Sequence, residues 1–251
     1  MTPEIIISAF GLPMAARVDK RVPKKLLLES AAPSATDKRL INEGIDGIQW
    51  LAALKPTTCG VPASVEQGQG YLEIAVIQLT LRTSAKQTRL VELVHRAIPY
   101  PVVLIAQQAE ALSLSLAHKR QALNEPDKVV LDGEVVTAPL QVASANAVEA
   151  FLLAMDLTRQ PRTSLFLLYQ GWMDTLVALQ ASAISGTFQP LDSAEGAANR
   201  RVALHACIAL QERIAALRSA ASKASQIARQ VELNIELRRL QDELVVARSR
   251  L

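Results

Sequence analysis

The segment YLEIAVIQLTLR, residues 71–82, decides the fold class of the first half of this chain. Side chains of an extended strand alternate between its two faces, so every second residue shares a face. One face carries Tyr71, Glu73, Ala75, Ile77, Leu79 and Leu81, and the other carries Leu72, Ile74 and Val76. A strand that is apolar on both faces is typical of the centre of a sheet covered on both sides. The segment therefore predicts a buried central strand with one acidic residue, Glu73.

Further strand and helix signals surround this segment as far as residue 140. Strands are predicted at residues 48–55, 102–107, 112–118 and 128–136, with a hairpin turn at Asp132-Gly133, and a short strand is predicted at 25–29. Helices are predicted at residues 2–10, 37–44 and 85–98, with Ser34 or Thr36 and Ser84 as capping residues. Residues 17–24 and 56–70 are predicted to be irregular. This alternation indicates a mixed α/β domain over residues 1–140.

The composition changes after Leu140, because strand signals disappear and alanine becomes abundant. Helices are predicted at residues 145–157 and, after Pro161, in a segment that Thr163 caps and that contains Trp172. A last helical region begins at Asp192 or Ser193. The predicted fold class is therefore α+β, in which the mixed α/β domain is followed by an all-helical region, residues 145–251, with a long amphipathic, coiled-coil-like helix.

Four leucines of the tail, Leu233, Leu237, Leu240 and Leu244, alternate steps of four and three, which is heptad spacing. Residues 218–226, RSAASKASQ, are small and polar, and they are a candidate hinge. One unbroken helix here would be too long for a domain of this size to cover, so it must fold back or meet another chain. The cover is the helix around Trp172, a second copy of the chain or a partner subunit. Self-association or partner binding through these leucines is favoured, because the stripe is terminal and regular.

Several runs of the first half resemble a known bacterial family. They are RVDKRVPKKLL (17–27), AALKPTT (52–58), YLEIAVIQLTLR (71–82), VHRAIPYPVVLI (94–105) and LSLAHKR (114–120), and together they resemble the family called domain of unknown function 4391. The resemblance covers the first half of the chain and, in outline, the helical tail. Members of that family are encoded beside DNA methyltransferases and beside helicases of Swi/Snf or type III restriction type. The resemblance therefore implies that this protein acts together with such enzymes. We therefore expect a non-catalytic accessory or assembly subunit of a restriction-like or phage-defence system, which docks a helicase or methyltransferase.

Nucleic acid is a further expected partner, because cations cluster at two places. Arg17, Lys20, Arg21, Lys24 and Lys25 lie close together, and Lys119 and Arg120 follow His118 at the end of a predicted strand; such groups can contact phosphates. The alternatives are a solvated loop for the first group and a polar turn for the second. The net charge of +3 permits nucleic-acid binding without arguing for it.

The alternative interpretation is that the chain is a divergent metal-dependent nuclease with Glu73 at its centre. Nucleases of the PD-(D/E)XK type place an acid and a lysine two residues apart on a central strand, where they hold a metal ion and activate water. Ala75 occupies the lysine position here, and no second acid is evident nearby. The competing interpretation is a structural acid that pairs with Arg82 or with a basic loop residue.

Other catalytic motifs are missing from the sequence. His95, His118 and His205 are far apart and have no ligand at metal spacing, and no glycine-rich nucleotide loop is present. No cofactor and no metal are therefore predicted, and enzymatic activity is left open. The two cysteines, Cys59 and Cys207, are expected to be free thiols. The N-terminus lacks a signal-peptide pattern, and no apolar run reaches membrane-spanning length, so a cytoplasmic location is expected.

Overall fold

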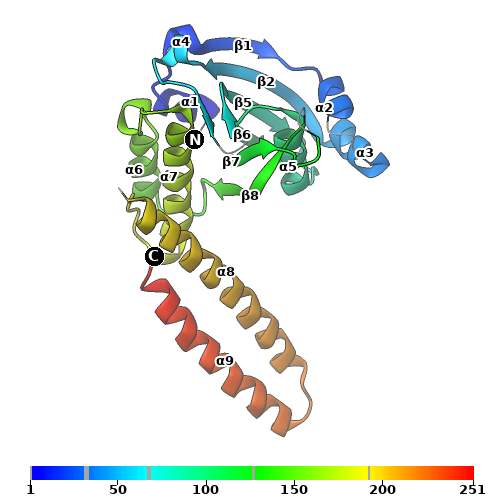
Figure 1. Cartoon of the computed structure of the whole chain (residues 1–251). Coiled ribbons are helices and arrows are strands. Elements are labelled where there is room, and N and C mark those ends of the chain that lie inside the picture. Colours follow the sequence, from blue (N-terminus) through cyan, green and yellow to red (C-terminus); the bar gives the residue numbers. More distant parts are fainter. Residues whose placement is uncertain (1, 31–33, 67–68, 126–127, 192) are drawn as a thin grey trace. The chain divides into compact units, whose positions relative to one another are not determined.

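The computed structural model describes residues 2–30, 34–66, 69–125, 128–191 and 193–251. The chain divides into two compact units, residues 1–176 and 177–251, which we describe separately. Figure 1 labels their helices and strands. Among the described residues, no helix combines the length and the hydropathy that a membrane crossing requires.

A six-stranded mixed sheet forms the centre of the first unit. Its strands, in spatial order, are β1 (Arg17–Arg21), β2 (Ile45–Leu54), β5 (Ile74–Leu81), β6 (Val102–Gln108), β7 (Ala111–Gln121) and β8 (Val129–Pro139). All neighbours are antiparallel except β5 and β6, which helix α5 (Gln87–Ala97) connects as a parallel pair. β5 is central and almost wholly buried, as the sequence predicts.

One face of the sheet is covered by α2 (Lys24–Ser30), α3 (Ala35–Gly44) and α5. Leu27, Ile41 and Leu90 from these helices belong to one buried core with Ile77 and Leu104 of the central strands. Ser34 begins α3 as predicted, because its side chain accepts a hydrogen bond from the Asp37 amide. A second layer of helices covers the opposite face of β5, β6 and β7.

That second layer includes α1 (Pro3–Ala9), α6 (Ala145–Ala154) and the first turns of α7 (Leu165–Ser185). The Tyr169 hydroxyl of α7 donates to the Val102 carbonyl at 2.8 Å and so ties the helix to β6. The Trp172 indole packs edge-on against Phe10, with ring centroids 5.2 Å apart, and donates to the Met155 carbonyl. The first unit is therefore a three-layer α/β/α domain.

The smaller elements are η1 (Met14–Ala16), α4 (Pro56–Cys59), β3 (Ser64–Glu66), β4 (Gln69–Tyr71) and η2 (Leu157–Arg159). Several sequence predictions are wrong in detail here. The basic segment is an edge strand followed by a helix, so the strand predicted at 25–29 does not exist. The predicted loop at 56–70 contains α4 and the β3–β4 hairpin, and α5 begins after Lys86 rather than at Ser84.

The predicted hairpin turn at Asp132-Gly133 is also wrong, because β8 continues through it. Gly133 has φ +86°, a left-handed conformation that suits glycine, and the register between β7 and β8 shifts between Leu116 and His118. The Asp-Gly pair therefore produces a β-bulge that bends the strand rather than reversing it.

The second unit contains the antiparallel helices α8 (Ala194–Lys223) and α9 (Ile227–Arg248), which pack along their length (Figure 1). Ser193 caps α8, whereas Asp192 lies outside the described residues. The turn at residues 224–226 falls in the predicted hinge, so the tail folds back on itself. Cys207 and Ile214 of α8 bury Leu240 and Leu244 of α9, while Leu233 is also buried and Leu237 is half-buried.

The α+β fold class is confirmed, because every strand of the described residues ends by Pro139 and helices follow. The limit between the compact units falls inside α7, after Leu176. It differs from the change in secondary structure at residues 140–145, so the proposed domain limits stay a prediction.

Candidate functional site

Glu73 and Lys55 form an ion pair at one end of the central sheet. The antiparallel register pairs Leu54, the last residue of β2, with Ile74, the first residue of β5, so Lys55 and Glu73 flank these ends. The Lys55 ammonium lies 3.0 Å from Glu73 Oε2. Glu73 therefore precedes β5 rather than lying within it, contrary to the sequence prediction.

The environment of Glu73 is partly unsatisfied. The residue is 7 % exposed, and its Oε1 atom is buried without a hydrogen-bond partner among the described residues. Arg82 is not its partner, because that guanidinium donates to the Glu43 carbonyl at the other end of β5. The expected pairing with a basic loop residue is met by Lys55.

No group of three or more His, Cys, Asp or Glu side chains suited to a metal ion occurs in the described part of the chain. A hard divalent cation takes about six oxygen ligands, several of them from carboxylates or carbonyls. Glu73 with Lys55 offers one carboxylate beside a cation, which suits an ion pair better than a metal centre.

A chain of hydrogen bonds links Tyr71 of β4, His118 of β7 and two residues of α7. The Tyr71 hydroxyl contacts His118 Nδ1, His118 Nε2 lies 2.8 Å from Gln170 Oε1, and the Gln170 amide donates to Asp174 at 2.9 Å. Burial raises the pKa of Tyr71, so its hydroxyl stays protonated. The Gln170 amide nitrogen already donates to Asp174, so Gln170 Oε1 accepts from Nε2 and Nδ1 is left to accept from the Tyr71 hydroxyl. The proton of the neutral imidazole then belongs on Nε2, which donates to Gln170.

Both ring nitrogens of His118 are thus engaged by protein groups, and neither is presented to a substrate. A general base needs a free lone pair within hydrogen-bond reach of the proton that it removes. The Tyr71–His118–Gln170–Asp174 chain therefore fixes β4, β7 and α7 to one another. His118 lies within β7, so the polar turn considered for it is wrong.

Lys119 is buried beneath the C-terminal end of α5, where it contacts main-chain carbonyls. It is 3 % exposed, and its ammonium donates to the carbonyl oxygens of His95, at 2.6 Å, and of Ile98. Burial lowers the pKa of Lys119 to about 7. The sequence predicts that Lys119 contacts phosphates, and this geometry corrects that prediction, because the residue is buried and its ammonium is bound to main-chain carbonyls.

His95 lies beside Lys119 in the same interior. It is fully buried, its Nε2 atom lies 3.0 Å from the Ser115 hydroxyl, and Nδ1 has no partner among the described residues. Burial, with a smaller contribution from the Lys119 charge, lowers the pKa of His95 to about 3. His95 therefore stays neutral and shielded from water, and we interpret it as a core residue.

The basic segment forms an edge of the sheet, so three of its cations are exposed on a strand rather than on a loop. Arg17, Lys20 and Arg21 lie on β1, and among the described residues none has an acidic partner at ion-pair distance. A bulge between Arg17 and Lys20 shifts the register, so Lys20 pairs with Trp50 of β2 and Arg17 with Ala52.

The remaining cations of the two predicted groups are engaged. Lys24 donates to the Ile45 carbonyl, and Lys25 lies 3.5 Å from Glu29 on α2. Arg120 lies 3.5 Å from Asp132 on β8. Because β2, β5 and β6 separate β1 from β7, the structure does not bring Arg120 together with the cations of β1.

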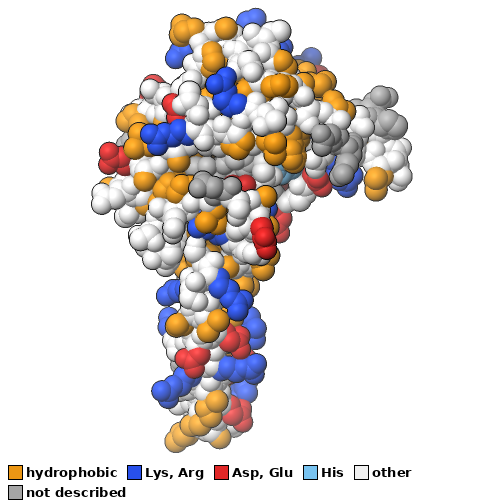
Figure 2. Space-filling view, turned by 60° about the vertical axis from the view of Figure 1, so that its left-hand side comes forward, with side chains coloured by type: hydrophobic (Ala, Val, Ile, Leu, Met, Phe, Trp, Pro, Cys, Tyr) orange, Lys and Arg blue, Asp and Glu red, His pale blue; other side chains and the backbone are white. Residues whose placement is uncertain are grey.

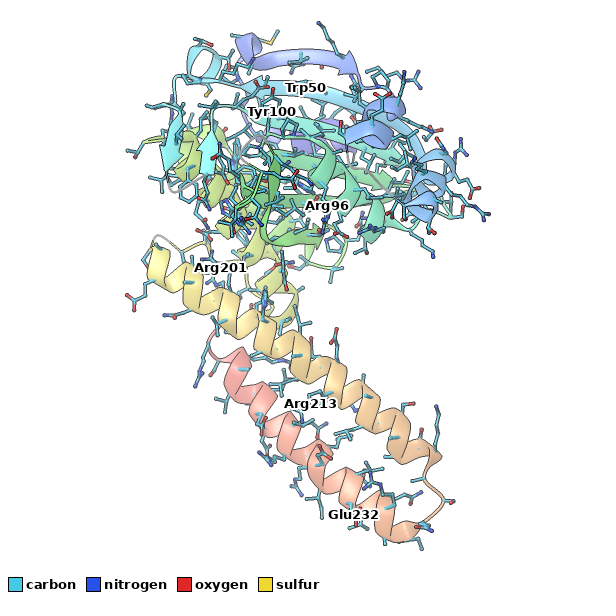
Figure 3. All side chains as sticks on the ribbon, turned by 45° about the vertical axis from the view of Figure 1, so that its right-hand side comes forward. Trp50, Arg96, Tyr100, Arg201, Arg213 and Glu232 are labelled. Atoms are coloured by element: carbon cyan, nitrogen blue, oxygen red, sulfur yellow. The ribbon has the colours of Figure 1, made fainter. Side chains whose placement is uncertain are left out.

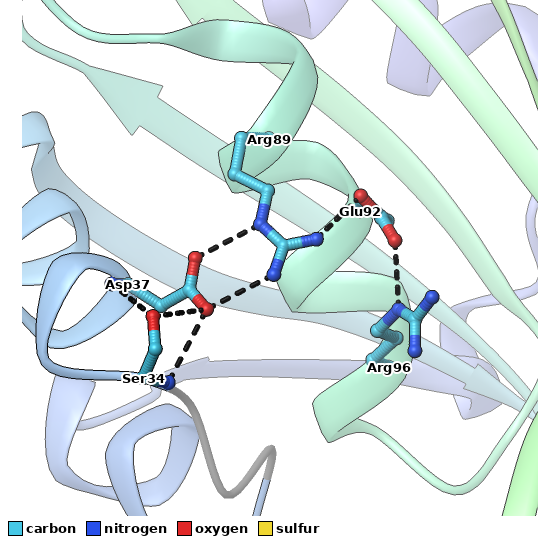
Figure 4. Close-up of polar contacts among 5 residues, drawn as sticks. All are labelled: Ser34, Asp37, Arg89, Glu92 and Arg96. Carbon is cyan, nitrogen blue, oxygen red and sulfur yellow. Dashed lines mark hydrogen bonds and ion pairs between the residues drawn. The ribbon is translucent and has the colours of Figure 1, made fainter.

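Several charges on α3 and α5 of the same unit are paired within the fold. Arg89 of α5 donates twice to Asp37 at the start of α3, and Glu92 joins Arg89 to Arg96 (Figure 4). The Arg89 guanidinium lowers the pKa of Asp37 to about 2. This ladder of hydrogen bonds and ion pairs ties α3 to α5.

An acidic groove lies between α1, α6 and the turn that joins β6 to β7. Its volume is about 1030 Å³, its apolar lining includes Ile5 and Leu153, and its acids are Glu4, Glu110, Glu149 and Asp156. Four acids with one arginine, Arg159, would repel a phosphate backbone. Any nucleic-acid contact of this unit is therefore better placed at β1.

Aromatic side chains add a small surface on the β1 side. Trp50 of β2 and Tyr100, which precedes β6, lie with ring centroids 6.5 Å apart, and Tyr100 is 38 % exposed (Figure 3). Lys20 pairs with Trp50 in the sheet register, so a cation and aromatic rings share this region. Such a combination suits contacts to phosphates and bases.

Sequence reasoning missed Lys55 and the Tyr71–His118 chain. The sequence does contain a signal for Lys55. If β2 and β5 pair antiparallel, the residue that follows β2 lies beside the residue that precedes β5, so Lys55 lies beside Glu73. No comparable signal marks Gln170 or Asp174, which α7 brings from far along the sequence.

Comparison with known proteins identifies a family for this chain but no individual relative. The model of the family described as "Domain of unknown function (DUF4391)" matches residues 10–244. No curated protein and no solved structure gives a significant match.

Proposed function

Because the chain belongs to the DUF4391 family, whose description assigns no activity, we propose its role from its own geometry. We propose a non-catalytic accessory subunit of a DNA-targeting system of the restriction or phage-defence type. Its first unit contacts nucleic acid along β1, and its helical hairpin docks protein partners such as a helicase or a DNA methyltransferase.

The observation that carries this proposal is the set of exposed cations on β1, Arg17, Lys20 and Arg21. Cations on an edge strand also prevent edge-to-edge aggregation, and that alone would account for a basic β1. Nucleic acid is favoured because these three have no acidic partner among the described residues, whereas Lys25, Arg39 and Arg96 do. Unpaired cations release counterions from DNA without first breaking an ion pair.

Replacing Arg17, Lys20 and Arg21 together with glutamine is expected to weaken binding to duplex DNA. The slope of log K against log salt should become shallower by about 0.9 for each lost phosphate contact. Fluorescence anisotropy with a labelled duplex over a series of salt concentrations measures this slope.

A matched triple variant, with glutamine at Arg39, Arg96 and Lys128, removes three exposed cations that already have acidic partners. It should leave the salt slope within error of the wild type. If the β1 triple variant binds DNA as tightly as the wild type at every salt concentration, β1 protects an edge and does not bind nucleic acid.

The second candidate function is a divergent metal-dependent nuclease centred on Glu73. The observation in its favour is the unpartnered Oε1 of Glu73 beside Lys55, an acid and a lysine at the end of a central strand. We favour the accessory role, because a nuclease centre needs further metal ligands and the described residues form no group of three or more His, Cys, Asp or Glu side chains that includes Glu73.

The Glu73→Gln variant separates the two functions. We expect no DNA cleavage by the wild type or the variant with Mg²⁺ or Mn²⁺. We also expect a change in the free energy of unfolding of no more than about 1 kcal/mol, because Lys55 is half-exposed. Cleavage assays and urea unfolding measure the two quantities. Metal-dependent cleavage that the folded variant loses would establish the nuclease function instead.

A further inference from the structure

Helix α9 carries a second stripe of residues, on the side that does not face α8. We call it the outer stripe: Val231, Ile235, Arg238, Asp242, Val245 and Ser249, spaced by four, three, four, three and four. Its three aliphatic side chains are 52 %, 67 % and 65 % exposed in that order. The leucines that α8 buries are different residues, so α9 is apolar on two sides.

An apolar stripe at heptad spacing that remains exposed is typical of a helix that pairs with another helix. The charges on α8 and α9 are otherwise mixed, with ion pairs such as Arg213–Glu236 between the helices and Arg229–Glu232 along α9. Arg213 and Glu232 lie on the two helices in Figure 3, and Figure 2 shows hydrophobic side chains exposed at the tip of the hairpin. The hairpin surface is therefore charged but interrupted by aliphatic side chains.

The outer stripe is symmetric about Leu240. Arg238 and Asp242 lie two residues on either side of it, Ile235 and Val245 lie five, and Val231 and Ser249 lie nine. When two copies of α9 pair antiparallel about a twofold axis at Leu240, each residue of the stripe meets another residue of the stripe. A twofold interface requires such a self-complementary surface.

The two charged residues of the outer stripe complement each other in this arrangement. Arg238 of one copy faces Asp242 of the second copy, and the reciprocal pair forms across the axis. Ile235 faces Val245 on either side of these two ion pairs. A parallel, in-register pair would instead place Arg238 against Arg238 and Asp242 against Asp242, so the charges select the antiparallel orientation.

We propose that this protein forms a homodimer in which the outer stripes of two α9 helices pair antiparallel, so that two hairpins build a four-helix assembly. A foreign partner would have no need of a stripe that is symmetric about its centre, whereas a second copy of this chain does. This inference goes beyond the proposed function, which assigns the hairpin to other protein partners, and it does not depend on nucleic-acid binding. It also differs from pairing through Leu233, Leu237, Leu240 and Leu244, which lie on the side of α9 that packs against α8.

The test uses the full chain and two single charge reversals, Arg238→Asp and Asp242→Arg. The wild type is expected to sediment as a dimer. Each variant alone places like charges together at both central positions, which should weaken dimerisation on the order of 10- to 100-fold. An equimolar mixture of the two variants restores both ion pairs in a heterodimer, so the dimer should return. Sedimentation velocity over a concentration series measures all three samples.

Arg239→Asp and Glu243→Arg are the matched controls. They reverse charges one residue along the same helix, in an exposed ion pair of 3.1 Å outside the outer stripe, and they should leave dimerisation unchanged. Far-UV circular dichroism should show equal helix content in all variants, because Arg238 and Asp242 are exposed.

Three results would overturn the proposal: a monomeric wild type, a dimer that either single reversal leaves intact, or a mixture that fails to restore the dimer. The DNA salt slope of the β1 triple variant is measured separately. A failed dimer together with a shallower salt slope in the β1 triple variant therefore rejects this interface alone. An intact dimer with an unchanged slope in that variant rejects only nucleic-acid binding.

Discussion

Replacing Leu240 with aspartate is expected to unfold the α8–α9 hairpin while the first unit stays folded. Leu240 is 3 % exposed and packs against Cys207, Ile214 and Leu244. The variant loses the burial of a leucine, about 1.5–3 kcal/mol, and places a carboxylate in the same apolar seam. A total cost on the order of 4 kcal/mol or more exceeds what a two-helix unit can absorb.

Two spectroscopic signals separate the units in this experiment. Both tryptophans, Trp50 and Trp172, lie in residues 1–176, so tryptophan fluorescence reports the first unit only. The Leu240→Asp variant should keep the tryptophan unfolding transition and lose helical circular dichroism. Limited proteolysis should then cut within residues 194–251.

The control is Ile227→Asp, which changes a side chain that is 79 % exposed at the first residue of α9. An acid is favourable at the start of a helix, so the hairpin should lose no more than about 0.5 kcal/mol. If Leu240→Asp keeps its helix content and instead dissociates a dimer, the leucine stripe is the contact between chains that its spacing first indicated.

The central part of the fold is predictable because its pattern is unambiguous. Residues 71–82 are apolar on both faces, which only a covered central strand explains, and β5 lies within them. The strand prediction at residues 25–29 is wrong because the pattern there is ambiguous. Three consecutive leucines fit a strand and a helix equally well, and the choice depends on the sheet onto which Leu27 packs.

The site is less predictable than the fold, because its contacts join distant segments. Glu73 is conspicuous as an acid in an apolar run, yet its partner Lys55 becomes evident only from the β2–β5 register. Lys119 follows a strand signal and would be solvated in most proteins. It is buried because the C-terminal end of α5 presents carbonyl oxygens there.

In the tail, the leucine stripe is buried as its spacing predicts, but α8 of the same chain covers it rather than a second chain. The leucine stripe of α9 and the Cys207–Ile214 stripe of α8 are both visible in the sequence. A turn at residues 224–226 lets the second stripe cover the first within one chain, which is the nearest available cover. The outer stripe is not evident from hydropathy alone, because Arg238 and Asp242 have the pattern of solvated residues and only their symmetry about Leu240 distinguishes them.

Lowering the pH from 9.5 to 7 is expected to destabilise the first unit, through Lys119. Burial lowers the pKa of this lysine to about 7, whereas an unfolded lysine binds its proton near pH 10.4. Between these values the unfolded chain binds more protons, so the free energy of unfolding falls as the pH falls. The expected loss over this window is about 3 kcal/mol.

His95 extends the decline to lower pH. Its pKa is lowered to about 3, so the unfolded chain binds an additional proton below about pH 6.5, and stability continues to fall. The upper limit of pH 9.5 matters, because burial raises the pKa values of Tyr71 and Tyr169. Above about pH 10 the folded chain keeps protons that the unfolded chain loses, and these tyrosines then lower stability as the pH rises.

Lys119→Met isolates the contribution of the lysine, since methionine retains an apolar stem and does not titrate. Its absolute stability can shift in either direction, because it removes a buried charge and also removes the donor to the His95 and Ile98 carbonyls. The slope is therefore the quantity to compare. Urea unfolding followed by tryptophan fluorescence should give a flat profile for Lys119→Met between pH 7 and 9.5, and the decline below pH 6.5 should remain.

Lys128→Met supplies the comparison at an exposed lysine that pairs with Glu125, and its profile should follow the wild type. Parallel profiles for the wild type and Lys119→Met would show that the ammonium remains charged at every pH tested. The two carbonyls and the negative end of α5 would then offset the cost of burial. The charge of Lys119 would in that case be a fixed component of the fold, so binding measurements at neutral pH would need no correction for its titration.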